Sequence, residues 1–153
     1  MARQHMPEYR VSIEVAAPAE RVFAEVADLT THSMWSADPL EIEPIDAGPL
    51  GPGKTYRSRA ISKGKRITAE LSVTQYVRPT LFEFTASDLT GRYGHQFRLR
   101  DAGSRTEVER TVTASLGFKQ RVLYMLVFRL VKLPNARRAM RLLKEHCERQ
   151  AGA

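Results

Sequence analysis

The sequence predicts an α+β domain in which a curved antiparallel sheet of about seven strands wraps around a long C-terminal helix. Three observations carry this prediction. An alternating segment and two short helical segments open the chain, six more alternating segments follow, and an apolar stripe with helical spacing ends it. The turns between the alternating segments are short, so consecutive strands pair antiparallel, because a parallel crossover needs a dozen or more residues. A sheet with one apolar face needs a cover, which the C-terminal helix is large enough to provide.

The opening strand spans residues 9–15, where polar and apolar residues alternate. A helix begins at residues 17–20, with Pro18 placed where its missing N–H does no harm and Glu20 near the positive end of the helix dipole. Residues 28–38 are rich in turn-forming residues and predict a second short helix or a loop.

The rest of the sheet is predicted by six alternating segments with Pro- or Gly-containing or polar turns between them. These segments are residues 40–45, 55–62, 65–77, 81–87, 92–100 and 105–114. The C-terminal helix then carries an apolar stripe formed by Leu123, Leu126, Leu130 and Leu133, and Met140, Leu143 and Cys147 continue a stripe after Pro134. We expect the proline at 134 to kink or interrupt this helix and Asn135 to cap its second part.

Length and composition indicate a single domain over residues 1–153, with its core between about residues 9 and 149. The single cysteine, Cys147, forms no internal disulfide, and the N-terminus shows no signal peptide, so we expect a cytoplasmic location. The four histidines are scattered and no cysteine pair exists, so we expect neither a metal site nor a cofactor.

Residues 48–55, GPLGPGKT, match the phosphate-loop pattern letter for letter. Pro49 and Pro52 lack the N–H groups that a nest around a phosphate needs, and the segment that follows alternates like a strand where a phosphate loop requires a helix. The match therefore predicts a turn between two strands, with no nucleotide.

The order of these elements, the opening IEVAAPAERVFAEVADLTTHSMW and the basic C-terminal helix resemble the polyketide cyclase/dehydrase branch of the START-like, helix-grip superfamily. The resemblance extends from about Tyr9 to Arg149. It implies a cavity for a lipid, a polyketide, an isoprenoid or a similar molecule between sheet and helix. It does not imply an enzyme, because the superfamily includes carriers and sensors as well as cyclases.

We therefore expect the protein to bind or carry a small hydrophobic ligand rather than to be an enzyme. One alternative is a cyclase or dehydratase acting in the same cavity, and another is a membrane-associated lipid-handling protein. The expected ligand contacts lie on the inner face of the sheet, at the entrance and on the helix: Trp35, Tyr56, Ser58, Leu71, Phe84, Tyr93, His95, Phe97, Arg110, Leu126 and Leu130.

Two of these candidates are polar groups on an apolar face. Arg110 could bind a ligand carboxylate or phenolate, because a buried guanidinium is costly without a partner. The alternatives are an ion pair with an acid of the sheet, or a strand phase shifted by one residue that places Arg110 in solvent. His95 is the candidate general base for a cyclisation, and the alternative is a hydrogen-bonded residue that lines the cavity.

Residues 119–149 hold nine basic and two acidic residues, which accounts for the whole formal charge of +7. Two interpretations of this basic helix stay open. It could contact an anionic membrane, or its basic face could simply be exposed to solvent. We expect no nucleic-acid binding, because no recognition motif accompanies the charge. The oligomeric state, monomer or homodimer, stays open. The basic residues expected to meet a membrane are Arg137, Arg138, Arg141 and Lys144.

Overall fold

A computed structural model describes residues 8–152, without the side chains of residues 127–129. The residues outside this range include His5 and the ends of the predicted 1–153 domain. In chain order the elements are β1 (Glu8–Val15), α1 (Ala19–Ala27), η1 (Leu29–Met34), β2 (Leu40–Pro44), β3 (Thr55–Ser62), β4 (Lys65–Val77), β5 (Leu81–Asp88), β6 (Gly91–Asp101), β7 (Thr106–Leu116), α2 (Phe118–Val127), η2 (Phe128–Lys132) and α3 (Leu133–Ala151).

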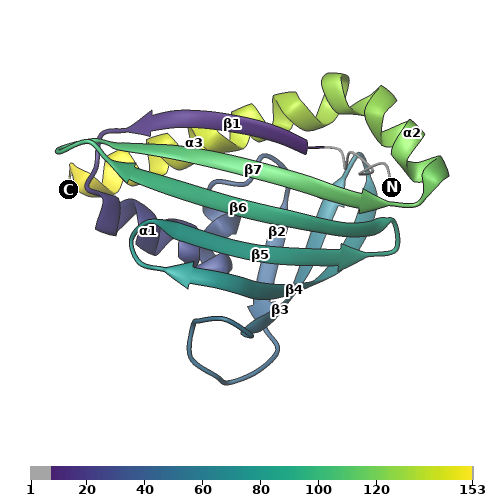
Figure 1. The fold of residues 1–153 in the computed structure, drawn as a ribbon, viewed down its shortest axis with the longest axis horizontal. Helices are drawn as coiled ribbons and strands as arrows, with labels where there is room; N and C mark the ends of the chain where they lie inside the picture. The colour runs from purple at the N-terminus through teal and green to yellow at the C-terminus, as the bar shows by residue number, and fades with distance from the viewer. Residues whose placement is uncertain (1–7, 153) are drawn as a thin grey trace, which may run out of the picture.

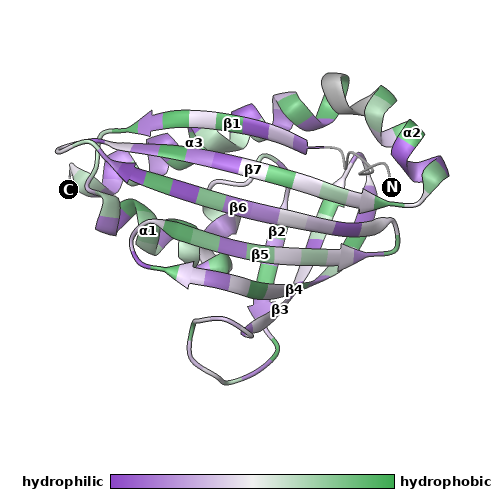
Figure 2. Cartoon of the chain, in the orientation of Figure 1, coloured by the Kyte–Doolittle hydropathy of each residue, from purple (hydrophilic) through white to green (hydrophobic). Residues whose placement is uncertain are grey.

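The seven strands form one antiparallel sheet in the order β1-β7-β6-β5-β4-β3-β2. β2 to β7 pair as consecutive hairpins, and β1 lies against β7, as Figure 1 shows. Each strand predicted from alternation is present, with ends that differ by at most two residues. Along β6 and β7 polar and apolar residues alternate, which gives the sheet an apolar inner face and a polar outer face (Figure 2).

The inner face is covered by α1, η1 and α3, which lie behind the sheet in Figure 1. The α1 helix buries Val22, Phe23 and Val26, which lie on one side of the helix. The apolar side of α3 is buried in the same core through Met140, Leu143 and other residues. The α+β helix-grip architecture predicted from the sequence is therefore confirmed.

The α2 helix does not cover the sheet. Leu123 and Leu126 of α2 are 61% and 70% exposed, and Leu130 of η2 is 81% exposed. Of the α2 side chains that the structure describes, Tyr124 alone is buried, and its ring lies 6.4 Å from that of Tyr93. The prediction that this leucine stripe closes onto the sheet is wrong, because α2 projects past the end of β7 (Figure 1). Of the two C-terminal helices, α3 is thus the one that covers the sheet, together with α1 and η1.

The junction before α3 also differs from the prediction. The helical backbone continues from α2 through the π-helical turn η2 into α3, with Pro134 in the first turn of α3, where a missing N–H is tolerated. Asn135 lies inside this helix and caps nothing. Its Nδ2 instead donates to Oδ2 of Asp38 over 3.3 Å, which ties α3 to the segment after η1.

No helix in the part of the chain that the structure describes combines the length and apolarity needed to cross a membrane. Over the same residues, no three His, Cys, Asp or Glu side chains gather as metal ligands would.

Candidate ligand-binding site

Six side chains lie next to one another at the middle of the sheet's inner face. Phe97 of β6 is paired with Arg110 of β7, and His95 of β6 is paired with Phe84 of β5. His32 of η1 and Trp35, which follows η1, pack against these strands from the helical layer. We call these six residues the inner-face cluster: His32, Trp35, Phe84, His95, Phe97 and Arg110.

Arg110 faces inward, so the alternative of a shifted strand phase is wrong. It is paired with Phe97 on one side and with Val11 of β1 on the other. Its Cζ lies 5.3 Å from the centroid of the Phe97 ring, and its Nη2 lies 3.3 Å from Nδ1 of His95. Its Nε is buried and has no hydrogen-bond partner among the described residues.

The other alternative for Arg110, an ion pair with an acid of the sheet, is also wrong. No carboxylate of the described residues lies within 4.0 Å of its guanidinium. The acids of neighbouring strands point to the outer face, where Glu107 pairs with Arg100, for example. The cluster therefore holds a half-buried cation without a counterion.

His95 is held neutral beside this cation. Burial, and next the positive charge of Arg110, keep the pKa of its imidazole well below the usual range. Arginine has only donors, so Nδ1 of His95 accepts from Arg110 and the proton of the neutral ring lies on Nε2. The ring is stacked on Phe84, with centroids 4.7 Å apart and planes 7° apart.

The helical layer supplies a second neutral imidazole. Nε2 of His32 donates to the carbonyl of Val26 over 2.7 Å, and burial lowers the pKa of His32 to about 4. Its ring lies 4.3 Å from that of Trp35. Trp35 is itself 2% exposed, and its indole N–H has no partner among the described residues. Trp35 is thus a core residue of the cluster as well as a candidate ligand contact.

His32 was missed by the sequence reasoning. It lies in a short 3-10 helix, where no sustained period assigns a face to a residue. The one signal that could have found it is its position three residues before the single tryptophan.

The remaining predicted site residues fall into two groups. Tyr56, Ser58 and Leu71 are on the inner face and are buried, while Tyr93 is half-buried. Leu126 and Leu130 are exposed and belong to the part of the chain that leaves the sheet. Toward α2 some residues of the inner face keep exposed surface, although their neighbours Ala114 and Leu71 are buried. We call its half-buried or exposed residues there the open end: Ala60, Ile67, Ala69, Ala86 and Tyr93.

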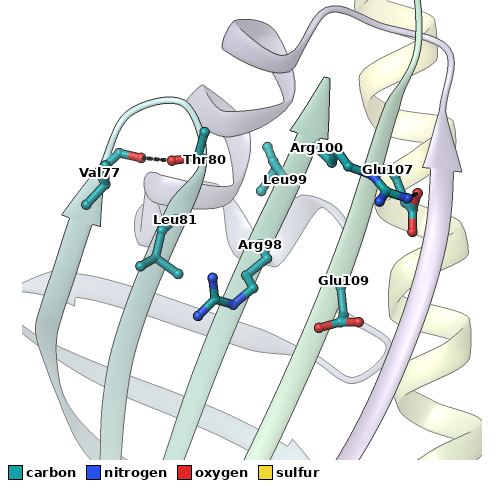
Figure 3. A pocket seen from close by; sticks show the side chains of 8 residues that line it. All are labelled: Val77, Thr80, Leu81, Arg98, Leu99, Arg100, Glu107 and Glu109. Carbon is teal, nitrogen blue, oxygen red and sulfur yellow. Dashed lines mark hydrogen bonds and ion pairs between the residues drawn. The ribbon is translucent and has the colours of Figure 1, made fainter. Parts of the chain in front are cut away.

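A surface hollow lies on the other side of the sheet. Its volume is about 460 Å³, and charged side chains of β6 and β7 line it: Arg98, Arg100, Glu107 and Glu109 (Figure 3). These side chains carry equal numbers of opposite charges. A second hollow of about 430 Å³ lies on the same outer face around Gly94, because a glycine has no side chain to fill this place. Of the predicted site residues, His95 lines the second hollow and none lines the first.

The phosphate-loop sequence folds as the predicted turn between β2 and β3. The groups that would bind a phosphate instead bind Asp46, whose Oδ2 accepts from the backbone N–H of Thr55 at 2.8 Å and from its hydroxyl at 2.7 Å. Lys54 donates to the carbonyls of Asp46 and Gly48. The hydrogen bonds from Thr55, together with one from the Gly48 N–H, hold the pKa of the Asp46 carboxyl well below its usual range.

Solved structures of several bacterial proteins share this fold. The ZhuI aromatase/cyclase from Streptomyces sp. R1128 matches with a TM-score of 0.74 and 17% identity, over 95% of this chain and 96% of that chain. A START superfamily protein from Mycobacterium smegmatis matches with a TM-score of 0.74 and 12% identity, over 94% and 98%. A protein from Thermus thermophilus matches with a TM-score of 0.73 and 21% identity, over 92% and 97%.

At these identities the likeness shows a shared fold and carries no activity from one protein to another. No match was found among curated proteins. The family model described as polyketide cyclase/dehydrase and lipid transport matches residues 6–148, almost the whole chain. The chain therefore belongs to the polyketide cyclase/dehydrase and lipid transport family, as its sequence indicates.

Proposed function

We propose that the protein binds a small hydrophobic molecule against the inner face of the sheet, between the inner-face cluster and the open end. The observation that carries this proposal is the uneven cover of the inner face. Phe82, Phe97 and Val108 are fully buried under the helical layer, whereas Ala86, Tyr93 and Ile67 on the same face retain exposed surface. A family that handles lipids and polyketides supports a ligand at this place.

In this proposal the half-buried residues Tyr93, His95 and Arg110 touch the ligand directly. The buried residues Tyr56 and Leu71 form the floor beneath it, together with Ser58, Phe84, Phe97 and Trp35. Leu126 and Leu130 add apolar contacts where the ligand enters. Each methylene group that the ligand buries contributes about 0.8 kcal/mol to binding. A lipid-sized ligand can therefore bind tightly while covering only part of this surface.

The cluster favours binding over base catalysis. A general base needs a free lone pair and a pKa near the working pH. In His95 the Nδ1 lone pair accepts from Arg110, and the pKa of the ring is lowered. A cyclase or dehydratase that uses His95 as its base would first have to break this hydrogen bond.

Two measurements test the proposal together. Native mass spectrometry of the protein from its own host should show added mass, which solvent extraction then identifies. Titration with N-phenyl-1-naphthylamine, which fluoresces in apolar surroundings, should give saturable binding. Ala86→Trp, which fills the open end, should weaken that binding about tenfold or more. Thr85→Trp, next to it on the outer face, is the matched control and should leave binding unchanged.

The proposal fails if the protein carries no added mass and does not bind the naphthylamine. It also fails if Ala86→Trp binds the probe as tightly as the unmodified protein while both are folded.

A second candidate function is favoured by the exposed apolar side chains of α2, and we propose it beside the first: contact with an anionic lipid surface. Phe118 is 81% exposed and Met125 66% exposed. Between residues 118 and 144 the chain has eight basic residues and no acidic residue. Exposed apolar side chains on a basic helix are typical of segments that lie in a lipid headgroup layer. Contact of this kind would let a ligand enter from the membrane.

A further inference from the structure

We infer that the ligand carries an anionic oxygen group, such as a carboxylate or an enolate, and that the guanidinium of Arg110 receives it. This inference rests on the proposed function, since it concerns the chemistry of a ligand in the same place. It goes further by naming the class of ligand: an apolar body with one negatively charged end, rather than a neutral hydrocarbon or alcohol.

The first support is the unbalanced charge of the inner-face cluster. Arg110 is half-buried, and no carboxylate of the described residues lies within 4.0 Å of it. Its near neighbours are the uncharged rings of Phe97 and His95. Burial and then the charge of Arg110 lower the pKa of the His95 imidazole, so the potential at this ring is positive. A positive site at low dielectric favours an anion over a neutral group.

The second support is the hydrogen-bonding character of the free groups. Nε of Arg110 is an unpartnered donor, and Nε2 of His95 carries a proton with no partner among the described residues. The indole N–H of Trp35 in the same cluster is a third unpartnered donor. The cluster has three such donors. Its free acceptor nitrogen is Nδ1 of His32. Donors from a guanidinium and an imidazole suit a carboxylate, which accepts through two oxygens.

The third support is position. Arg110 and His95 lie between the closed part of the inner face and the open end. Tyr93 is two residues from His95 on the same face, about 7 Å along the strand. Ala69 lies two strands from His95 and four residues further in the same direction, about 10 Å across and about 13 Å along the sheet. A ligand whose charged end meets Arg110 would therefore place its apolar body over Tyr93, Ala86 and Ala69 and leave through the open end.

The test compares two probes that differ by a single anionic group. 8-Anilinonaphthalene-1-sulfonate is N-phenyl-1-naphthylamine with an added sulfonate, and both fluoresce when bound in apolar surroundings. The dissociation constants of both are measured for the unmodified protein, for Arg110→Met and for Arg98→Met. Arg98 lies on the outer face of β6 and is exposed, so Arg98→Met is the matched control for loss of one positive charge.

We expect the unmodified protein to bind the sulfonate about 10- to 100-fold more tightly than the amine, the usual gain from hydrogen bonds to a charged group. Arg110→Met should lose this preference while its affinity for the neutral amine stays within about twofold, and Arg98→Met should keep it. A competition experiment in which dodecanoate displaces the amine better than dodecan-1-ol does would extend the result to carboxylates.

Equal affinity for sulfonate and amine in the unmodified protein would overturn the inference while leaving the proposed function in place. The same holds if Arg110→Met, shown to be folded by circular dichroism, still prefers the sulfonate. If neither probe binds the unmodified protein, the proposed function fails and the inference fails with it.

Discussion

Arg110 and His95 meet on the inner face of the sheet, where the guanidinium donates across 3.3 Å to an imidazole that burial and this same charge keep neutral. The pair joins the neighbouring strands β6 and β7. The contact is diagonal, because Arg110 is paired with Phe97 in the register and not with His95. It is a hydrogen bond between a cation and a neutral ring. The guanidinium of Arg110 therefore has a hydrogen-bond acceptor but no negative charge that neutralises it.

Arg110→Met should therefore raise the stability of the protein without ligand. Removing a half-buried charge that has no counterion relieves a desolvation cost of several kcal/mol. This gain outweighs the lost cation–π contact with Phe97, about 0.5–1 kcal/mol, and the lost hydrogen bond to Nδ1 of His95, about 1–3 kcal/mol. We expect the free energy of unfolding to rise by about 1 kcal/mol or more, measured by urea denaturation. Arg98→Met, the exposed control, should change it by less than about 0.5 kcal/mol. A less stable Arg110→Met variant would mean that another group balances the charge.

Acidification should destabilise the fold through His32 and His95. Both have a pKa in the folded protein below the unfolded value of 6.5, and that of His32 is about 4. The unfolded chain thus binds more protons between these values, so stability is complete above pH 6.5 and falls as the pH drops toward 4. For His32 alone the loss amounts to roughly 3 kcal/mol over this window.

The measurement is the melting temperature between pH 5 and pH 7.5 for the unmodified protein and for His32→Gln/His95→Gln. Every other titratable group is shared, so the difference in slope reports these two imidazoles. The slope should flatten in the double variant. Parallel curves would show that neither ring is kept neutral by the fold.

Much of the fold follows from the sequence because alternation and short turns act locally. Residues 55–62 and 65–77 are strands with the predicted ends, since a Lys-Gly turn between two period-two segments leaves few other arrangements. The phase of β7 around Arg110 was predicted correctly for the same reason. Alternation could not show whether an acid balances Arg110, because that depends on side chains of other strands.

The leucine stripe of α2 shows the limit of this reasoning. A stripe at helical spacing indicates one apolar side, but it does not say which surface covers that side. The sheet has room for one long cover, and α3 takes that place with Met140 and Leu143. His32 was missed for a related reason, since a six-residue 3-10 helix is too short to assign faces from a period.

Leu143→Ala and Leu126→Ala should separate these two parts of the C-terminal helix. Leu143 is fully buried in the core, so truncation should cost about 2–5 kcal/mol of unfolding free energy. Leu126 is 70% exposed, and its truncation should cost less than about 0.5 kcal/mol. Urea denaturation of both variants decides the matter. Similar losses in the two would indicate that α2 packs on the sheet in solution.

Asp46→Asn should loosen the loop between β2 and β3 without creating a nucleotide site. The substitution weakens the acceptor that holds the N–H groups of Thr55 and Gly48, so amide exchange of both should accelerate. Asp101→Asn, which loses a comparable bond to Gly103 in another turn, is the control and should leave Thr55 unaffected. Calorimetric titration with Mg-ATP should show no heat of binding for either protein, and saturable binding would contradict the role given to Asp46.

Contact with a lipid surface should depend on the apolar side chains of α2 together with the basic residues near them. Arg137, Arg138 and Arg141 are exposed and form no ion pair among the described residues. Lys144, also expected at a membrane, is instead bound to Glu148 and to the carbonyl of Glu14. We therefore expect the three arginines, and not Lys144, to meet anionic lipid.

The measurement is sedimentation with phosphatidylcholine vesicles with and without phosphatidylglycerol. Binding should require the anionic lipid and weaken in 0.5 M salt, a condition that screens charge over about 4 Å. Met125→Ser/Leu126→Ser should reduce it about tenfold or more, because two exposed apolar side chains no longer enter the lipid.

Val77→Ser is the matched control for this double variant. Val77 is 53% exposed at the far end of β4, beside Arg78, which pairs with Glu20 of α1. That end of the sheet is the one farther from α2 (Figure 1), so the substitution should leave vesicle binding unchanged. If both variants bind like the unmodified protein, the apolar side of α2 does not enter the lipid. The ligand would then have to reach the open end from solution, since outside α2 and η2 no described helix combines large exposed apolar side chains with an excess of basic residues.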